Sequence, residues 1–207
     1  MKTTPNRPGP IGVLISGRGT NLQALIEAQR DGRLSSPIAV VVSNRADAAG
    51  LQRAAHAGIE TLVLPHGRHA TRDAYDGELA DALRARGVSL VCLAGFMRLL
   101  GAGFCSAFPN AILNIHPSLL PAFPGVDAQA QALAHGVRVT GATVHFVTPE
   151  LDAGPIVLQE AVPVEDGDTV ERLSARILEA EHRIYPAAVS RVLAGGWRLE
   201  GRRVIFE

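Results

Sequence analysis

The chain has 207 residues, of which 47% are hydrophobic and 19% charged, and its 20 basic residues balance its 20 acidic ones. This composition allows a full apolar core and argues against disorder, while zero net charge gives no electrostatic surface for nucleic acid or an anionic membrane. No apolar run reaches the length of a transmembrane helix, and residues 1–10 lack the apolar segment of a signal peptide, so we expect a cytoplasmic protein.

The first half of the sequence alternates short apolar runs with amphipathic patterns. Strands are predicted at residues 11–15, 38–42, 61–64, 88–94 and 111–115. Helices are predicted directly after the first strand, between the second strand and Gly58, and over residues 71–86. Thr20 or Asn21 is expected to cap the first helix. Strands that are apolar throughout and separated by helices indicate a parallel sheet covered on both faces.

The pattern changes after residue 121. Extended segments are predicted at residues 141–147 and 154–162, a long helix at 170–193, and a short hairpin from 197 to 206 around Gly201. We therefore expect one α/β domain, a mostly parallel twisted sheet flanked by helices with a Rossmann-like N-terminal half. Its expected parts are an N-terminal half (about 11–110), a second half (about 111–195) and the C-terminal hairpin (196–207) of a single domain, 1–207.

A glycine-containing turn, SGRGTN at residues 16–21, joins the first strand to the first helix. Glycines allow a tight turn and close approach to a ligand, and the free N–H groups of a helix N-terminus suit phosphate. The segment is neither GxxxxGKS nor GxGxxG, because no Lys-Ser pair and no third glycine follow. We predict phosphate binding here, with a simple tight turn as the alternative.

Asn114 and His116 stand two residues apart at the end of the fifth predicted strand. The period of two places both side chains on one face of the strand, and Pro117 ends it. The carboxyl ends of strands are where α/β proteins place their ligands, and an amide and an imidazole can both stabilise an oxyanion. We therefore predict that these two residues take part in catalysis, with a structural histidine as the alternative.

Asp152 lies in a glycine- and proline-containing segment that is typical of a loop. A carboxylate close to His116 would orient the imidazole and favour its protonated form. The spacing cannot show whether the fold brings the two together, and an ordinary Asx-turn is the alternative. The remaining histidines, including His145, fit ordinary structural positions. Neither they nor the two cysteines have a metal-ligand spacing, so we predict no catalytic metal.

Five motifs together resemble the phosphoribosylglycinamide formyltransferase family, the folate-dependent enzymes of purine biosynthesis. They are SGRGTN, AGFMRLL (94–100), LNIHPSLLPAFPG (113–125), GATVHFVTPELDAGPI (141–156) and EAEHRIYP (179–186). Each motif alone is moderately specific, but their order and spacing match over residues 11–186. The resemblance implies that 10-formyltetrahydrofolate, as cosubstrate, donates a formyl group to the terminal amine of glycinamide ribonucleotide.

The resemblance also implies site residues. The match to the catalytic residues comprises Asn114, His116 and Asp152. The match to the ribonucleotide site comprises Gly19, Thr20, Asn21 and Glu181, with an ion pair to Arg183 or another helix neighbour as the alternative role of Glu181. The match to the folate site comprises Arg72, Met97, Arg98, Leu99, Leu100, Asn114, Thr148, Pro149, Glu150, Leu151 and Asp152. The implied partners are small molecules, with no nucleic acid or membrane, and the protein is expected to be a monomer or homodimer.

Some positions depart from the family pattern. Asp127 and Gln129 stand where relatives often carry histidines, and Pro149 stands where they often carry an acid. The sequence leaves open how these changes affect the two loops. The Leu120–Pro121 bond is expected to be cis, as in relatives with the same SLLP turn.

Other functions are less consistent with the sequence. The methionyl-tRNA formyltransferase and formyltetrahydrofolate deformylase usually carry an additional domain, for which we expect no room here. A non-catalytic nucleotide-binding module explains the glycine turn but leaves the Asn, His and Asp set unexplained. A dinucleotide dehydrogenase is disfavoured by the missing third glycine and by Ser43-Asn44, where an acid for the ribose is expected.

Overall fold

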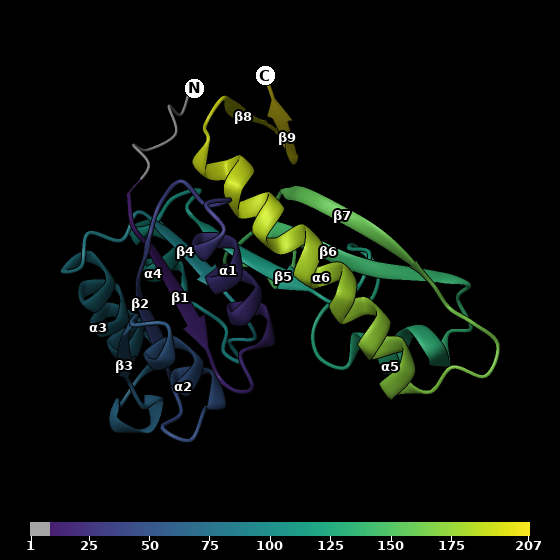
Figure 1. The fold of residues 1–207 in the computed structure, drawn as a ribbon, viewed down its shortest axis with the longest axis horizontal. Helices are drawn as coiled ribbons and strands as arrows, with labels where there is room; N and C mark the ends of the chain where they lie inside the picture. The colour runs from purple at the N-terminus through teal and green to yellow at the C-terminus, as the bar shows by residue number, and fades with distance from the viewer. Residues whose placement is uncertain (1–8) are drawn as a thin grey trace.

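The computed structural model describes residues 9–207, which form one nine-stranded sheet with helices on both faces (Figure 1). The strands are β1 (Ile11–Ile15), β2 (Ile38–Ser43), β3 (Glu60–Val63), β4 (Leu90–Leu93), β5 (Ile112–His116), β6 (Val139–Phe146), β7 (Ile156–Pro163), β8 (Trp197–Glu200) and β9 (Arg203–Phe206). The helices are α1 (Thr20–Arg30), α2 (Ala49–His56), α3 (Arg72–Arg84), α4 (Ala102–Ala107), α5 (Ala128–Ala134) and α6 (Val170–Leu193), with a 3₁₀ turn, η1, at His66–Arg68. The predicted fold class is confirmed.

No helix within residues 9–207 is both long and apolar enough to cross a membrane. The expectation about a signal peptide concerns residues 1–10, of which the first eight lie outside the described residues.

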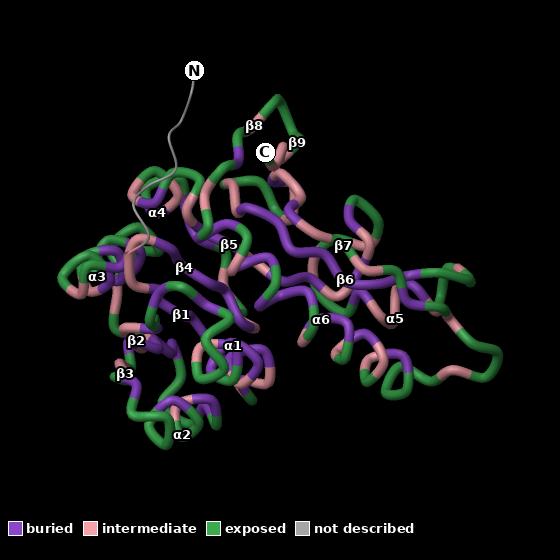
Figure 2. The backbone as a smooth tube through the Cα atoms, turned by 45° about the horizontal axis from the view of Figure 1, so that its top comes forward, coloured by how far each residue is buried: buried purple, intermediate pink, exposed green. Residues whose placement is uncertain are grey.

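The N-terminal half of the sheet is parallel, in the order β3-β2-β1-β4-β5. Every residue of β1 and β4 is buried, because helices cover both faces of these central strands (Figure 2). This burial explains why both strands are apolar without alternation. The strand order reverses between β1 and β4, so a crevice for a ligand is expected at the carboxyl ends of these two strands.

The sheet becomes antiparallel where β6 pairs with β5. In this register Asn114 lies opposite His145, and His116 lies opposite Thr143. The neighbouring strand β7 is antiparallel to β6, and the β8–β9 hairpin joins β7 through one parallel pair. The antiparallel pairing therefore brings the side chains of β6 beside the two candidate catalytic residues of β5.

Two apolar clusters cover the two faces of the sheet. One contains buried residues of α1, α2 and α6, including Leu22, Leu25 and Ile177, and the other contains residues of α3 and α4, including Leu79 and Phe104. In Figure 1, α6 runs diagonally across the same face as α1. Tyr185 of α6 fixes this helix, because its hydroxyl donates to the Leu93 carbonyl and lies 3.2 Å from the Leu113 carbonyl. The long helix is thereby held against β4 and β5.

Some local predictions were wrong or incomplete. Neither Thr20 nor Asn21 caps α1: the capping residue is Gly19, in a left-handed conformation (φ 70°) and without a side-chain hydrogen bond. The short helices α4 and α5 were not predicted, because six or seven residues give too little periodicity. In contrast, α6 has the predicted bounds, and the Thr169 hydroxyl accepts the Arg172 N–H at its start.

Candidate functional site

The glycine turn lies at the carboxyl end of β1 and leads directly into α1. The first helical hydrogen bond runs from the Gln23 N–H to the Gly19 carbonyl (3.0 Å), so the N–H groups before it have no acceptor within the helix. The turn is supported by α2, since the Gly50 N–H donates to the Gly17 carbonyl (3.0 Å). A Cβ on Gly19 would lie 2.6 Å from the Gly50 Cα. Only glycine allows this approach at a positive φ.

Asn21 and Glu181 connect the turn to α6. The Asn21 Nδ2 donates to a Glu181 carboxylate oxygen at 2.8 Å, and both residues are buried. Burial raises the pKa of the Glu181 carboxyl, and the hydrogen bond from Asn21 offsets this only in part. The alternative of a helix-neighbour ion pair is wrong for Glu181, because Arg183 pairs with Glu160. The predicted ribonucleotide-site residues therefore lie together at the start of α1.

Ser16, which follows β1, connects the ends of three neighbouring strands. Its hydroxyl donates to Asn44 Oδ1 (2.7 Å) and accepts the Met97 N–H (2.8 Å). These contacts fix residues 97–100, which follow β4, beside the glycine turn. Met97 and Leu99 are exposed there, whereas Leu100 is buried. The structure thus places part of the predicted folate site directly beside the predicted phosphate site.

The predicted catalytic residues lie together at the end of β5. Asp152 Oδ2 is 3.5 Å from His116 Nδ1, and Asp152 Oδ1 is 3.6 Å from His145 Nε2. The opposite ring nitrogen of His116, Nε2, donates to the Phe123 carbonyl at 2.9 Å. The His116 residue is only 4% exposed. The Asx-turn alternative for Asp152 therefore does not account for its position, because the fold brings its carboxylate to the imidazole.

Asp152 is positioned by an unusual backbone at the end of the 148–152 loop. It has a positive φ of 48°, and its Oδ2 accepts the Gly125 N–H at 2.8 Å. A Cβ on Gly154 would lie 1.8 Å from the Phe146 carbonyl oxygen, so the loop can approach β6 only with glycine at this position. The carboxylate consequently joins the 122–127 and 148–152 loops next to His116.

His145 is a site residue that was not predicted from the sequence. This side chain is 2% exposed, and its Nδ1 donates to the Phe146 carbonyl (2.9 Å), which leaves Nε2 to accept from Asn114 Nδ2 at 3.2 Å. Burial lowers the pKa of His145, which favours this neutral ring. The alternating pattern of residues 141–147 placed His145 on a strand, but only the β5–β6 register puts it opposite Asn114.

The turn after His116 contains a cis Leu120–Pro121 bond, as predicted. Thr143 of β6 supports the turn, since its hydroxyl accepts the Leu120 N–H (3.1 Å) and donates to the Ser118 carbonyl (2.7 Å). Asp127, one of the departures from the family pattern, precedes α5 with φ 55°. Gln131 closes the following turn by donating to the Val126 carbonyl at 2.8 Å.

The remaining folate-site residues border this cluster. Asn114 lies opposite Leu93 in the β4–β5 pair and opposite His145 in the β5–β6 pair, and so stands between the 94–100 and 148–152 segments. Arg72 is the first residue of α3, and its Nε lies 3.4 Å from the position of a Cβ on Gly101. Within residues 9–207, no group of three His, Cys, Asp or Glu side chains is arranged to hold a metal ion.

Comparison with known proteins agrees with this geometry. Residues 10–189 match the family described as formyl transferase. The phosphoribosylglycinamide formyltransferase of Escherichia coli (strain K12) is 45% identical over 197 residues, which cover 95% of this chain and 90% of that protein. A crystal structure of glycinamide ribonucleotide transformylase 1 from Symbiobacterium toebii is 58% identical, with a TM-score of 0.94 over 96% of this chain and 94% of that one.

Longer proteins also contain this unit. The trifunctional purine biosynthetic protein adenosine-3 of Gallus gallus is 51% identical over 185 residues, which cover 89% of this chain. The match covers 18% of that protein, so the chain spans less than a fifth of such trifunctional relatives.

Proposed function

The chain belongs to the formyl transferase family, and we propose that it transfers the formyl group of 10-formyltetrahydrofolate to the terminal amine of glycinamide ribonucleotide. The products are formylglycinamide ribonucleotide and tetrahydrofolate, as in de novo purine biosynthesis. The observation that supports this proposal most is the cluster at the end of β5, where His116 faces Asp152 and Asn114 contacts His145.

In the proposed reaction, the amine nitrogen attacks the formyl carbon and gives a tetrahedral intermediate with a negative oxygen. The amide of Asn114 and a protonated His116 donate hydrogen bonds to this oxygen. The bond between the formyl carbon and N10 of the folate then breaks. A proton moves from the attacking amine to N10, with Asp152 assisting through water, so that charge and atoms balance.

His116 must exchange a hydrogen bond to act in this way. Its Nε2 donates to the Phe123 carbonyl, while Nδ1 faces Asp152. A ring that is charged can donate at both nitrogens, and Nδ1 then points its N–H toward the Asp152 carboxylate 3.5 Å away. We infer that the oxyanion replaces the Phe123 carbonyl as the acceptor for Nε2 when both substrates are bound.

Two groups of residues bind the substrates in this proposal. The N–H groups of Gly19, Thr20 and Asn21 hold the phosphate, and the Glu181 carboxylate accepts hydrogen bonds from the ribose hydroxyls. The folate is held by Arg72, the 97–100 segment and the 148–152 loop. Binding both molecules side by side brings the amine of the ribonucleotide close to the formyl carbon of the folate. The single unit, with a phosphate half at 11–110 and a catalytic half at 111–195, acts in the cytoplasm on small molecules.

A coupled-substrate assay tests this function. Purified protein is mixed with 10-formyltetrahydrofolate, and loss of its absorbance is followed with glycinamide ribonucleotide, with the dephosphorylated glycinamide riboside, or with no acceptor. We expect rapid loss only with the ribonucleotide. Equal rates with and without acceptor indicate a hydrolase instead, and no loss with any acceptor contradicts catalysis of this reaction.

A further inference from the structure

Buried polar atoms without partners gather around α3. Among the described residues, seven buried side-chain nitrogen or oxygen atoms have no hydrogen-bond partner in the protein, and four of them lie in this region. They are His69 Nδ1, Tyr75 Oη, Asp76 Oδ1 and Arg98 Nε. Unpaired buried polar atoms are costly and uncommon. Two of the residues that carry these atoms contact the 97–101 segment: Tyr75 through Arg98 and Asp76 through Gly101.

Asp76 makes the most direct contact with the segment. This residue is 3% exposed, and its Oδ2 accepts the Gly101 N–H at 2.7 Å. Gly101 is the residue before α4 and directly follows the 97–100 segment. A Cβ on Gly101 would lie 3.0 Å from this carboxylate oxygen, so glycine lets the backbone come close to it. Asp76 thus fixes the point at which the segment ends.

Two arginines, Arg72 and Arg98, lie near the same end of α3. Burial raises the pKa of Asp76, and the charges of Arg72 and Arg98 act against this rise. The Arg98 guanidinium lies over the Tyr75 ring, 5.1 Å from its centroid. Because α3 carries Arg72, Tyr75 and Asp76 within two turns, one helix face contacts the 97–101 segment at several positions.

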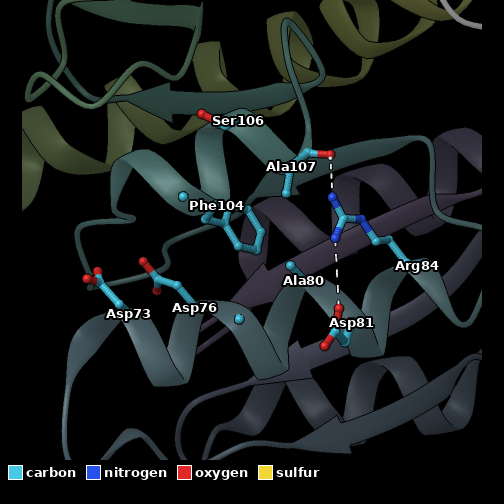
Figure 3. A pocket seen from close by; sticks show the side chains of 10 residues that line it. Asp73, Asp76, Ala80, Asp81, Arg84, Phe104, Ser106 and Ala107 are labelled. Carbon is cyan, nitrogen blue, oxygen red and sulfur yellow. Dashed lines mark hydrogen bonds and ion pairs between the residues drawn. The ribbon is translucent and has the colours of Figure 1, made fainter.

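Figure 3 shows the surroundings of Asp76. Its side chain and that of Asp73 lie at one end of a hollow between α3 and α4, whereas Asp81 and Arg84 lie at the other. Asp73 is exposed, and its Oδ1 lies 3.4 Å from the position of a Cβ on Gly101, but the Gly101 N–H donates to Asp76. Asp73 and Asp76 therefore offer a matched pair on one helix, of which only Asp76 bonds to the backbone of Gly101.

We propose that Asp76 is a positioning residue for the folate donor: its bond to Gly101 fixes the end of the 97–101 segment, four residues of which belong to the predicted folate site. The proposal rests on the proposed function for the identity of the donor. Asp76 does not touch the reacting atoms. Losing it weakens donor binding in the ground state and the transition state alike, which changes KM more than kcat.

Three variants separate this role from general support of the fold. Asp76→Ala removes the oxygen that accepts the Gly101 N–H. Asp76→Asn keeps an amide oxygen that can accept the same N–H, and Asp73→Ala is the control. We expect Asp76→Ala to raise the KM for 10-formyltetrahydrofolate at least tenfold while the KM for glycinamide ribonucleotide stays within twofold. The KM for 10-formyltetrahydrofolate should stay within threefold of the wild-type value in Asp76→Asn and within twofold in Asp73→Ala. Amide hydrogen exchange should rise in residues 97–101 of Asp76→Ala only.

Asp76→Glu keeps the proposal testable if Asp76→Ala does not fold. The longer side chain keeps the charge but displaces the carboxylate, so donor KM should again rise at least fivefold. An unchanged donor KM, an equal rise in both KM values, or an equal effect of Asp73→Ala overturns the proposal. Affinity for a non-reactive deazafolate analogue is measured in parallel. If the wild type binds the analogue but formylates nothing, the proposed function fails while the analogue affinities still test Asp76.

Discussion

The two ends of the proposed substrate site are built in different ways. At the proposed ribonucleotide end, one continuous strand–turn–helix, residues 11–30, supplies the glycine turn and its backbone N–H groups, and only Glu181 comes from elsewhere. At the proposed formyl-transfer end, Asn114 and His116 meet His145 and Asp152 from segments that are distant in the sequence. The first end depends on local backbone geometry, whereas the second depends on strand register and loop closure. Substitutions at the two ends should therefore affect different kinetic constants.

The largest effect is expected at the formyl-transfer end. His116→Ala removes the proton-carrying group, and we expect turnover to fall at least ~100-fold, the usual scale for general acid–base catalysis. Asp152→Asn should have a comparable effect, because a neutral amide replaces the carboxylate that faces His116 Nδ1. Steady-state kinetics measure kcat, with the exposed His56→Ala as control. Near-normal kcat in both site variants is incompatible with the assigned roles.

The difference between the two ends also explains what the sequence could predict. The glycine turn and its helix were predictable because the signal lies in consecutive residues. The long helix α6 was predictable from its periodicity, which extends over more than six turns. The meeting of Asp152 with His116 was predictable only through family resemblance, and the contact of His145 with Asn114 was missed, because both depend on the β5–β6 register. Register between distant segments leaves little trace in a single sequence.

A second effect, on binding alone, is expected at the ribonucleotide end. Glu181→Ala removes an acceptor for the ribose hydroxyls, a loss of about 2 kcal/mol, or roughly thirtyfold in KM for glycinamide ribonucleotide. The KM for 10-formyltetrahydrofolate should change little, because the donor's predicted site lies elsewhere. Glu179→Ala, an exposed acid on the same helix, is the control. A rise confined to the KM for 10-formyltetrahydrofolate would mean that the ribonucleotide binds elsewhere. The two ends would then not differ in the way described above.

The local character of the glycine turn can be tested with two glycines. Gly19→Ala introduces a side chain at φ 70° and against Gly50, whereas a Cβ on Gly17 meets nothing within 4 Å. Left-handed strain of about 1–2 kcal/mol should raise the KM for the ribonucleotide roughly tenfold in Gly19→Ala. In Gly17→Ala the KM for the ribonucleotide should stay within twofold of the wild-type value. Equal KM values for the two variants would show that the turn does not hold the phosphate.

The smallest effect concerns pH and the buried Glu181. Its pKa is raised in the folded protein, so its contribution to stability is full below the unfolded pKa near 4.5 and is lost as pH rises through the folded pKa. Glu181→Gln cannot ionise. We therefore expect the melting temperature of Glu181→Gln to increase relative to that of the wild type as pH rises above about 4.5. A difference in melting temperature that is constant from pH 4 to 8 would contradict the raised pKa.

The most direct test of formyl transfer follows the formyl carbon itself. 10-Formyltetrahydrofolate labelled at that carbon is mixed with excess enzyme and glycinamide ribonucleotide, and the products of a single turnover are separated. We expect the label in formylglycinamide ribonucleotide with the wild type and almost none there with His116→Ala in the same time. Label released as free formate, or a His116→Ala rate equal to that of the wild type, would contradict formyl transfer at this site.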